Sequence, residues 1–581
     1  AGRAGPLRGP PFRIAPMPRL ASTACPLLLA LLALAGAARA EPPVPSMYAD
    51  AAPFRTAIER ERPPPGSRTL PVTGISVPHH LLAADLIARG FATLAGNSYD
   101  RVILLSPDHF NKARRPFATT RRDIETVLGT VAADRAAVET LLASPDLVEE
   151  SGLFDGEHGI AALLPFLKEA LPQTPVVAIA ISIRADRADW DRMVAALKPL
   201  VTPRTLVVQS TDYSHYLPHA ASLARDQETL NVIASGDAEA VTHLISSDHM
   251  DSRGAQYIQM RLQEAGGSHA VVIANRNSIE YVPHASRTTS YVVSVYSPER
   301  AAFPLAYADQ EVTVFAGDLL AGRYLTKPLA DPAISAAIVA RVKALTGGAP
   351  MVVNLEGAML KEPPEGLPDN LHVMPAGLAI PLLRALNVRA ANLANNHAFD
   401  LGRDGYRETA ALLRGAGITP LLHEEAADLG PLRLWPVNLV GRNDRAGFPV
   451  ARPEALDILC RKQAKPPLVA LVHWGVEYVE TLRPEEREAA SILQRCGAGL
   501  IVGAHSHRGI DRIEAPAGGA YALLPSLGNF LFDQTASRGS GVLLEVRRFR
   551  QGTLASRVLP LPNLFDEANA MLREGEHPAG E

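Results

Sequence analysis

The chain has 581 residues, of which 47% are hydrophobic and 20% are charged, and its formal net charge at pH 7 is −4. The composition is ordinary for a soluble globular protein, and the length exceeds what one hydrophobic core supports, so two domains are expected. The slightly acidic balance, together with the lack of a long basic run, argues against nucleic acid as a partner.

The amino-terminal segment has the layout of a secretory signal peptide. Met17-Pro18-Arg19 gives a short positive start, residues 27–35 are apolar, and Ala38-Arg39-Ala40 is a small-residue cleavage site. We expect residues 1–40 to be the signal peptide, with 1–16 as a candidate untranslated stretch before Met17. An uncleaved anchor is the alternative, although the apolar stretch is shorter than the ~20 residues of a spanning helix. No later segment is long and apolar enough to be predicted as a transmembrane span. With a signal peptide and no such span, the expected location is the periplasm or envelope of a bacterium.

The remaining sequence predicts two α/β domains joined by a linker. The expected parts are a Pro-rich leader at 41–68, a first domain at 69–297, a linker at 298–310, a second domain at 311–563 and a tail at 564–581. The leader is expected to be either poorly ordered or a wrapping arm. In both domains short apolar strands alternate with helical patterns, which indicates mostly parallel sheets covered by helices. The expected strands are 71–77, 101–105, 206–209, 271–275, 291–296, 312–316, 351–353, 390–393, 468–472 and 500–502, and the clearest helices are 81–94 and 484–495. Cys460 and Cys496 either form a disulfide or are two buried thiols.

Polar side chains follow five of the strands expected in the second domain. A parallel sheet presents its functional groups at the carboxyl ends of its strands, so these side chains should meet at one edge. The candidate metal ligands are Asp318, Glu356, Asn396, His473, His505 and His507. This set of carboxylate, amide and imidazole groups suits two divalent transition metals (Mn, Zn or Fe), with Glu356 as the bridge.

Three other residues have expected roles near these ligands. His397 adjoins Asn396 and is a candidate general acid toward a leaving oxygen. Arg323 is a candidate for gripping a phosphate or carboxylate with two hydrogen bonds. Glu477 either orients a metal-binding histidine by a hydrogen bond or forms a salt bridge. In the His505-x-His507 pair, strand alternation would turn both rings to the same side.

These segments resemble the calcineurin-like metallophosphoesterases and, more closely, the CapA family of capsule biosynthesis (poly-γ-glutamate synthesis type). The resemblance covers about residues 310–563 and rests on 315–323, 353–357, 394–400, 473–477, 503–507 and 526–533. It implies a four-layer α/β fold and a role in making or handling an extracellular anionic polymer or its precursors. Leu320 stands where the phosphoesterases have a histidine, and Glu356 stands where they have an aspartate, so one metal position is expected to differ.

The first domain also carries ionisable residues after its strands. The candidate site consists of His79, His109, Asp212, His215 and Asp251. The segments Pro78-His79, Ser106-Pro-x-His109, Glu157-His-x-Ile160 and Ser210-Thr-Asp-Tyr-Ser-His215 resemble the Memo family, called AmmeMemoRadiSam system protein B in bacteria. That family is similar in fold to the class III extradiol dioxygenases, where two histidines and a carboxylate hold non-haem iron.

The Memo resemblance implies a single Fe or Cu ion in this half. Two departures bear on it: Phe110 replaces a second histidine, and Asp251 stands where the family has a cysteine, which exchanges a thiolate for an oxygen ligand. A harder metal is one consequence, and a degenerate domain retained as a scaffold or binding module is the alternative.

Three functions follow from these patterns. The first is an exported metal-dependent hydrolase or transferase acting on a phosphate, ester or amide bond of a cell-surface anionic polymer. The second is a non-catalytic envelope or polymer-assembly factor whose metal is structural. The third, lesser hypothesis makes the amino half an iron-dependent, dioxygenase-like enzyme. An open coordination position facing a cleft would separate the first two.

Overall fold

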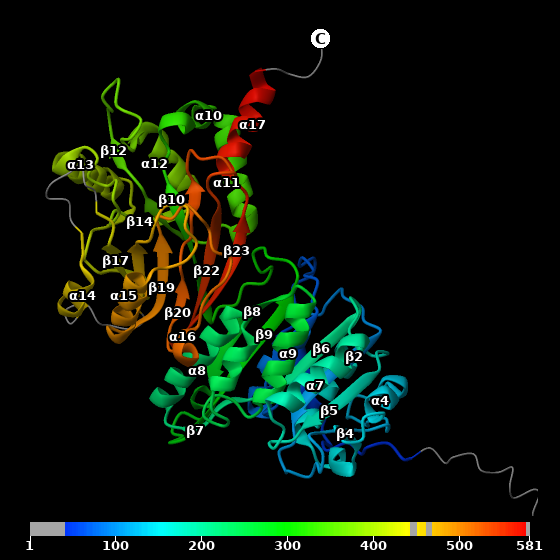
Figure 1. The fold of residues 1–581 in the computed structure, drawn as a ribbon. Helices are drawn as coiled ribbons and strands as arrows, with labels where there is room; N and C mark the ends of the chain where they lie inside the picture. Colours follow the sequence, from blue (N-terminus) through cyan, green and yellow to red (C-terminus); the bar gives the residue numbers. More distant parts are fainter. Residues whose placement is uncertain (1–40, 442–449, 461–467, 577–581) are drawn as a thin grey trace, which may run out of the picture. The chain divides into compact units, whose positions relative to one another are not determined.

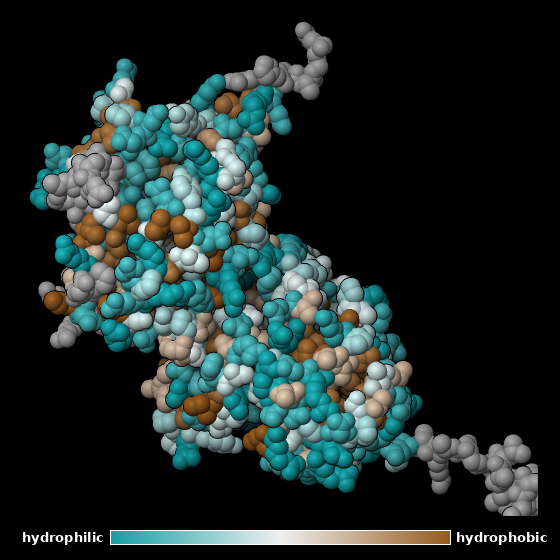
Figure 2. Space-filling view, in the orientation of Figure 1, coloured by the Kyte–Doolittle hydropathy of each residue, from teal (hydrophilic) through white to brown (hydrophobic). Residues whose placement is uncertain are grey.

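The computed structural model describes residues 41–441, 450–460 and 468–576 (Figure 1). The chain divides into two units, residues 1–43 and 44–581, and every described helix and strand lies in the second unit. The expected signal peptide lies outside the described residues. Among those that are described, no helix has the length and apolar character needed to cross a membrane, and the face seen in Figure 2 is mostly hydrophilic with smaller hydrophobic patches.

The amino half is built on one nine-stranded sheet. The strands, in sheet order, are β4 (Val148–Glu150), β3 (Phe117–Thr119), β5 (Val176–Ile181), β2 (Arg101–Pro107), β6 (Thr205–Ser210), β1 (Gly74–Val77), β9 (Thr288–Ser297) and β7 (Tyr213–Leu217), and β8 (His269–Asn277) pairs with β9. The central strands β5, β2, β6 and β1 are parallel, whereas β9 runs antiparallel to β1. The central strands are buried on both faces, which explains why their sequences are unbroken apolar runs.

Helices cover both faces of this sheet. On one face, α3 (Ala84–Ala92) and α6 (Leu164–Ala170) share a core with α2 (Ala52–Arg60). On the other face lie α7 (Arg187–Leu197) and α9 (Arg253–Ala265). The segment 41–68 therefore contains a helix whose Phe54 and Ala57 are buried, so this segment is a packed arm and not a loose leader.

The carboxyl half contains two larger sheets. The first has the order β15 (Thr419–Leu421), β14 (Val388–Asn392), β11 (Met351–Leu355), β10 (Gln310–Leu319), β22 (Gly541–Phe549) and β23 (Leu554–Leu561), with β21 (Asn529–Leu531) beside β10. The second has the order β16 (Ala427–Leu429), β17 (Leu432–Asn438), β18 (Leu468–His473), β19 (Ala498–Ala504) and β20 (Ala522–Leu524). Within them β10, β11 and β14 are parallel to one another, as are β17, β18 and β19.

The two sheets pack face to face through a shared core that includes Phe315, Leu434 and Leu471. The helices α11 (Pro332–Thr346), α12 (Ala376–Ala385), α13 (Gly402–Gly415) and α17 (Leu564–Glu576) cover the outer face of the first sheet. The helices α14 (Pro453–Cys460) and α15 (Pro484–Arg495) cover the outer face of the second sheet. This arrangement is the expected four-layer α/β fold.

Most expected elements form where the sequence places them. Helix α15 has the expected bounds, because Pro484 suits its first position and two glutamates occupy its first turn. Within the segment expected as a tail, α17 contributes Leu564 and Ala568 to the core. Cys496 is disulfide-bonded, whereas the side chain of Cys460 lies outside the described residues.

Candidate functional site

The expected ligands of the carboxyl half gather at the carboxyl ends of strands from both sheets. Asp318 is near the end of β10, and Glu356 follows β11 directly. Asn396 lies beyond β14, His473 is the last residue of β18, and His505 follows β19. All these side chains are buried.

Glu356 stands at the centre of two ligand groups. One group joins Glu356 to Asp318 and His507, and the other joins it to His473 and His505. In each group the potential ligand atoms lie within 4.8 Å of one another. His473 Nε2 is also 2.8 Å from Asn396 Oδ1, which adds the amide to the second group. Two adjacent groups that share one carboxylate are the arrangement a two-metal site requires.

Several atoms in these groups are buried without a hydrogen-bond partner among the described residues. They are both carboxylate oxygens of Glu356 and His505 Nδ1, and Asp318 Oδ2 has only an ion-pair contact with His507 Nδ1, at 3.2 Å. Burial, followed by the charges of Asp318 and Glu477, raises the pKa of Glu356 well above its ordinary value. Unpaired buried polar atoms are costly, and bound cations would satisfy this whole set at once. The residues therefore fit a pair of divalent metals.

The two histidines after β19 owe their positions to the loop conformation. The strand ends at Ala504, so strand alternation, which we expected to place His505 and His507, does not apply to them. Both have positive φ, 96° at His505 and 56° at His507. Strained backbone of this kind concentrates at functional sites, where surrounding structure holds it in place.

His397 is oriented by a carboxylate that our site prediction did not include. Its Nδ1 lies 2.9 Å from Asp400 Oδ2, and the same oxygen accepts a hydrogen bond from the His372 backbone N–H at 2.6 Å. The His372 ring stacks on His397, with centroids 3.4 Å apart and planes 13° apart. Asp400 could have been found because it lies in the quoted segment 394–400, whereas His372 follows no expected strand and carries no local signal.

The other two expected residues lie at the edge of the site. The guanidinium of Arg323 donates two hydrogen bonds to Asp533, at 2.8 and 2.7 Å, and one to the carbonyl of Asp369. Its phosphate-gripping role stays a prediction, and it would require exchange of the Asp533 carboxylate for the substrate. Glu477 is exposed, and its expected contact with a metal-binding histidine stays a prediction. Its charge nevertheless raises the pKa of Glu356 and of His507.

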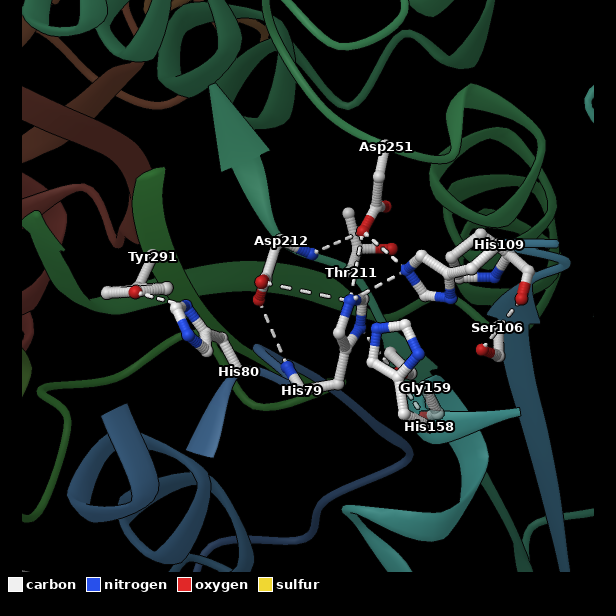
Figure 3. A network of polar contacts seen from close by, with 12 residues as sticks. His79, His80, Ser106, His109, His158, Gly159, Thr211, Asp212, Asp251 and Tyr291 are labelled. Carbon is white, nitrogen blue, oxygen red and sulfur yellow. Dashed lines mark hydrogen bonds and ion pairs between the residues drawn. The ribbon is translucent and has the colours of Figure 1, made fainter. Parts of the chain in front are cut away.

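The amino half has its own cluster of histidines and carboxylates (Figure 3). His79 follows β1 and His109 follows β2, and their Nε2 atoms are 3.0 Å apart. Asp251 Oδ2, from the loop before α9, is 3.3 Å from His79 Nε2 and 3.8 Å from His109 Nε2. Figure 3 shows the three side chains pointing toward one another. Two histidines and one carboxylate thus converge on one point.

Hydrogen bonds at Nδ1 fix the tautomers of the His79 and His109 rings. Glu157 accepts from His109 Nδ1 at 2.6 Å. Ser210 Oγ donates to the Gly159 carbonyl, so it accepts from His79 Nδ1 at 3.0 Å. With both Nδ1 atoms acting as donors, neutral rings would aim two Nε2 lone pairs at each other, which is favourable only with a cation or proton between them.

Burial and neighbouring charges shift the pKa values of His79 and His109 in opposite directions. Burial lowers the pKa of His79 well below its ordinary value. Burial also opposes protonation of His109, but hydrogen bonds with Asp251 and Glu157 raise its pKa to about 10. The two rings are therefore unequal, and a single shared proton would reside on His109.

Asp212 and His215 lie beside this cluster. Asp212 Oδ1 accepts the His79 backbone N–H at 3.1 Å, and its Oδ2 is 3.7 Å from His79 Nε2. Burial, followed by the charge of Asp251, raises the pKa of Asp212 to about 8. His215 Nδ1 is buried and has no hydrogen-bond partner among the described residues.

His158 is a member of the cluster that our site prediction omitted. Its ring centroid is 3.9 Å from that of His109, and its potential ligand atom lies within 4.8 Å of those of His79 and His109. The segment Glu157-His158 belongs to the Memo resemblance and so pointed to this residue. His158 was not predicted as a site residue because it begins a helix and does not follow a strand.

The structure thus defines a protein of two α/β halves, each with a buried group of histidines and carboxylates at strand ends. Residues 56–295 match the family model described as Memo-like protein, and residues 312–421 and 454–534 match the bacterial capsule synthesis protein PGA_cap. The chain is therefore a fusion of a Memo-family domain and a PGA_cap domain, which confirms both expected resemblances. The Memo family has an extradiol-dioxygenase-like fold.

Individual relatives match one half or the other. The PGA biosynthesis protein CapA of Bacillus subtilis (strain 168) is 26% identical over 280 residues, covering 44% of this chain and 72% of the relative. A MEMO1 family protein of Thermotoga sp. (strain RQ2) is 26% identical over 197 residues, covering 32% of this chain and 71% of the relative. The capsule biosynthesis protein CapA of Bacillus anthracis is 26% identical over 216 residues, covering 33% of this chain and 52% of the relative.

Proposed function

We propose that the carboxyl half is a metal-dependent hydrolase or transferase that acts outside the cytoplasm on an anionic cell-surface polymer or its precursors. The carrying observation is that Glu356 belongs to two ligand groups at once, with both of its oxygens buried and unpaired among the described residues. The polymer class is inferred from the PGA_cap match and from the printed names of the CapA relatives.

The ligand groups assign a role to each side chain. Asp318 and His507 would hold one divalent metal, Asn396, His473 and His505 the other, and Glu356 both. Bound metals would supply Lewis-acid activation of water and of the scissile bond. Asp400 accepts from His397 Nδ1 and would stabilise the imidazolium form of the ring, whose Nε2–H would protonate the leaving oxygen.

Metal content and turnover of the full chain test this proposal together. We expect Asp318→Ala and His505→Ala each to lower the bound transition metal by about one equivalent, measured by elemental analysis. Hydrolysis of bis(p-nitrophenyl) phosphate, a general diester probe, should fall by at least about 10²-fold in both variants. His423→Ala, which removes a largely buried histidine outside these ligand groups, is the control and should retain both. Full activity of Asp318→Ala would contradict the proposal, and metal binding without turnover would favour the assembly-factor alternative.

We further propose that the amino half binds one first-row metal ion, such as Fe or Cu. The supporting observation is the convergence of His79 Nε2, His109 Nε2 and Asp251 Oδ2. Hydrogen bonds at Nδ1 fix the tautomers of both histidines. Two histidines with one carboxylate are the ligand set of non-haem iron oxygenases. Anaerobic loading with Fe(II), followed by nitric oxide and electron paramagnetic resonance, tests for an open iron position. A spectrum unchanged in His109→Ala would contradict this assignment.

A further inference from the structure

Large apolar side chains are exposed along the edge of the amino-half sheet that holds the histidine cluster. Five of those exposed in this half lie at this edge: Leu82, Phe110, Ile183, Tyr216 and Val282. The first three follow the parallel strands β1, β2 and β5, and the other two lie beside the start of β9, which is antiparallel to β1. A single exposed apolar side chain is ordinary, whereas several along one edge indicate an interaction surface. We propose that this edge docks on a lipid bilayer that contains anionic lipids.

Two loops at this edge are held side by side. The loop 108–116 joins β2 to β3, and β5 lies between these two strands in the sheet, so this loop crosses the carboxyl end of β5. The loop after β5 begins at the same place. The Asp108 backbone N–H donates to the Ile181 carbonyl at 2.9 Å, and the Ser182 backbone N–H donates to the Pro116 carbonyl at 3.0 Å. Hydrogen bonds at both ends of the loop 108–116 therefore fix it beside the loop after β5.

Both loops expose an apolar side chain. Phe110 is 53% exposed and Ile183 is 67% exposed. Phe110 directly follows the cluster residue His109, and its ring is edge-on to that of His158, with centroids 5.8 Å apart. The Nζ of Lys112 lies 5.3 Å from the centroid of the Phe110 ring. Transfer of the two apolar side chains into the interfacial region of a bilayer is favourable because it removes apolar surface from water.

The same two loops carry cationic side chains. Four of these are exposed: Lys112, Arg114, Arg115 and Arg184. Glu149 accepts from Arg114 Nε at 3.1 Å, and Asp186 caps α7 at the end of the second loop. Two of the four positive charges therefore remain in excess over these two carboxylates. The guanidinium of Arg184 donates to the carbonyl of Ala113, which ties the two loops together. An anionic lipid surface attracts each lysine or arginine held close to it.

The combination of apolar and cationic side chains fits a bilayer better than a dissolved polyanion. A polyanion in solution would contact the cations and leave Phe110 and Ile183 in water. At a bilayer, apolar side chains enter the interface while lysine and arginine side chains extend to the lipid phosphates. The net charge of the whole chain is −4, so a local cationic patch would set which face of the protein meets an anionic surface.

Docking at this edge would bring the histidine cluster to the lipid surface. The side chains of His109 and His158 are 19% and 38% exposed, and Phe110 lies next to both. A docked protein would therefore present the cluster to amphiphilic molecules held in the bilayer. This surface goes beyond the metal sites proposed above and does not depend on a metal in either half.

Vesicle co-sedimentation tests the proposal directly. The chain from Glu41 onward includes every described residue and leaves out the apolar stretch 27–35. It is mixed with phosphatidylcholine vesicles that contain either no phosphatidylglycerol or about 30% of it. We expect at least about tenfold stronger binding to the anionic vesicles, and a fall in this binding as the salt concentration rises.

Variants separate the apolar contribution from the cationic one. The double variant with Phe110→Ser and Ile183→Ser should bind anionic vesicles at least about tenfold more weakly than the wild type. Lys112→Gln and Arg115→Gln should each weaken this binding about fivefold and leave the weaker binding to neutral vesicles unchanged. Circular dichroism checks that each variant is folded.

Two matched controls lie away from this edge. Ile458→Ser changes a side chain that is 66% exposed in the carboxyl half. Lys198→Gln removes an exposed cation from the connection that leads into β6, at the opposite edge of the amino-half sheet. Both variants should bind vesicles as the wild type does.

Three results would overturn the proposal. Equal binding to neutral and anionic vesicles would show that anionic lipids are not recognised. Binding to neither kind of vesicle would leave a protein as the partner of this edge. If the double variant binds anionic vesicles and soluble poly-γ-glutamate as tightly as the wild type does, the cations act alone and the edge is a polyanion site.

Discussion

At the scale of single residues, the carboxyl-half site depends on groups that hold its ligands in place. Asp400 is the clearest of these, because one of its oxygens accepts hydrogen bonds from both His397 Nδ1 and the His372 backbone. The Asp400 side chain is fully buried.

We predict that Asp400→Asn lowers turnover without removing the two principal metals. An amide at this position neither stabilises a charged His397 nor fixes its tautomer, so kcat should fall on the order of 10²-fold while KM changes little. Steady-state kinetics and elemental analysis measure the two effects. Asp404→Asn, four residues along on an exposed helical turn, is the control. Loss of both metals in Asp400→Asn would mean that Asp400 supports the whole fold of the site.

Under the proposed assignment, Asp251 is the ligand that would set the metal preference of the amino-half site. The Memo resemblance expects a thiolate at its position, whereas this chain places a carboxylate oxygen 3.3 Å from His79 Nε2. Oxygen ligands favour harder ions than thiolates do.

We predict that Asp251→Cys shifts this site toward soft metals. The variant should bind Cu(I) more tightly than the wild type and Fe(II) or Mn(II) less tightly, by roughly tenfold or more each. Competition dialysis under anaerobic conditions measures the change. Asp248→Cys adds a thiol in the same loop and should leave the preference unchanged. An unaltered preference in Asp251→Cys would show that Asp251 is not a ligand.

At the scale of elements, the hairpin of β22 and β23 depends on a buried charge network. Glu545 on β22 accepts from Arg547 on the same strand and from Arg557 on β23, each at 2.8 Å. Burial alone would raise the pKa of Glu545, but the two guanidinium groups lower it to about 2. Since β22 pairs with β10, this network stabilises the strand that carries Asp318.

We predict that Glu545→Gln destabilises the carboxyl half by roughly 3 kcal/mol at pH 7, because it leaves two buried guanidinium groups without a counter-ion. The folded pKa lies below the ordinary value of 4.5, so the contribution is complete above about pH 4.5 and is lost as the pH falls toward 2. The difference in Tm between wild type and variant should therefore shrink in acid. A difference that stays constant from pH 7 to pH 3 would contradict this account.

Glycines at two strand ends allow the loops of the site to approach closely. A Cβ at Gly317, next to Asp318, would lie 1.8 Å from the Gly528 carbonyl oxygen. A Cβ at Gly503, two residues before His505, would lie 1.9 Å from the Pro525 carbonyl oxygen. Both contacts are with backbone, which cannot rotate away, so side chains at these positions would displace the ligands.

At the scale of the whole molecule, metal binding should contribute measurably to stability. Glu356 and His505 have buried atoms without a hydrogen-bond partner among the described residues, and a bound metal would remove this cost and so stabilise the carboxyl half. A metal present at 100 times its Kd stabilises a fold by about 2.7 kcal/mol per independent site.

We predict that chelation lowers the Tm of the carboxyl-half transition by several degrees, and that re-addition of Mn²⁺ or Zn²⁺ restores it. Calorimetry follows the transition, and His505→Ala should show a much smaller response because part of the site is gone. An identical Tm with and without chelator, in protein shown to contain metal, would mean that the metal binds without supporting the fold.

The sequence by itself determined the fold class and indicated most of the side chains that gather in the two clusters. Strand periodicity and polar residues at strand ends are local signals, and the topology of parallel sheets brings those ends together. This reasoning predicted that Asp318 lies near Glu356 and that His79 lies near His109, as the structure shows.

Only the tertiary structure decided which other groups contact and position the predicted ligands. His372 comes from a loop before the short strand β13 (Val373–Pro375), which pairs with the strand Ala358–Leu360 after Glu356, and its ring stacks on His397. Arg323 meets Asp533 across 210 residues, and His505 and His507 depend on strained loop backbone. Such contacts arise between segments distant in the chain, where neither periodicity nor spacing carries information about distance.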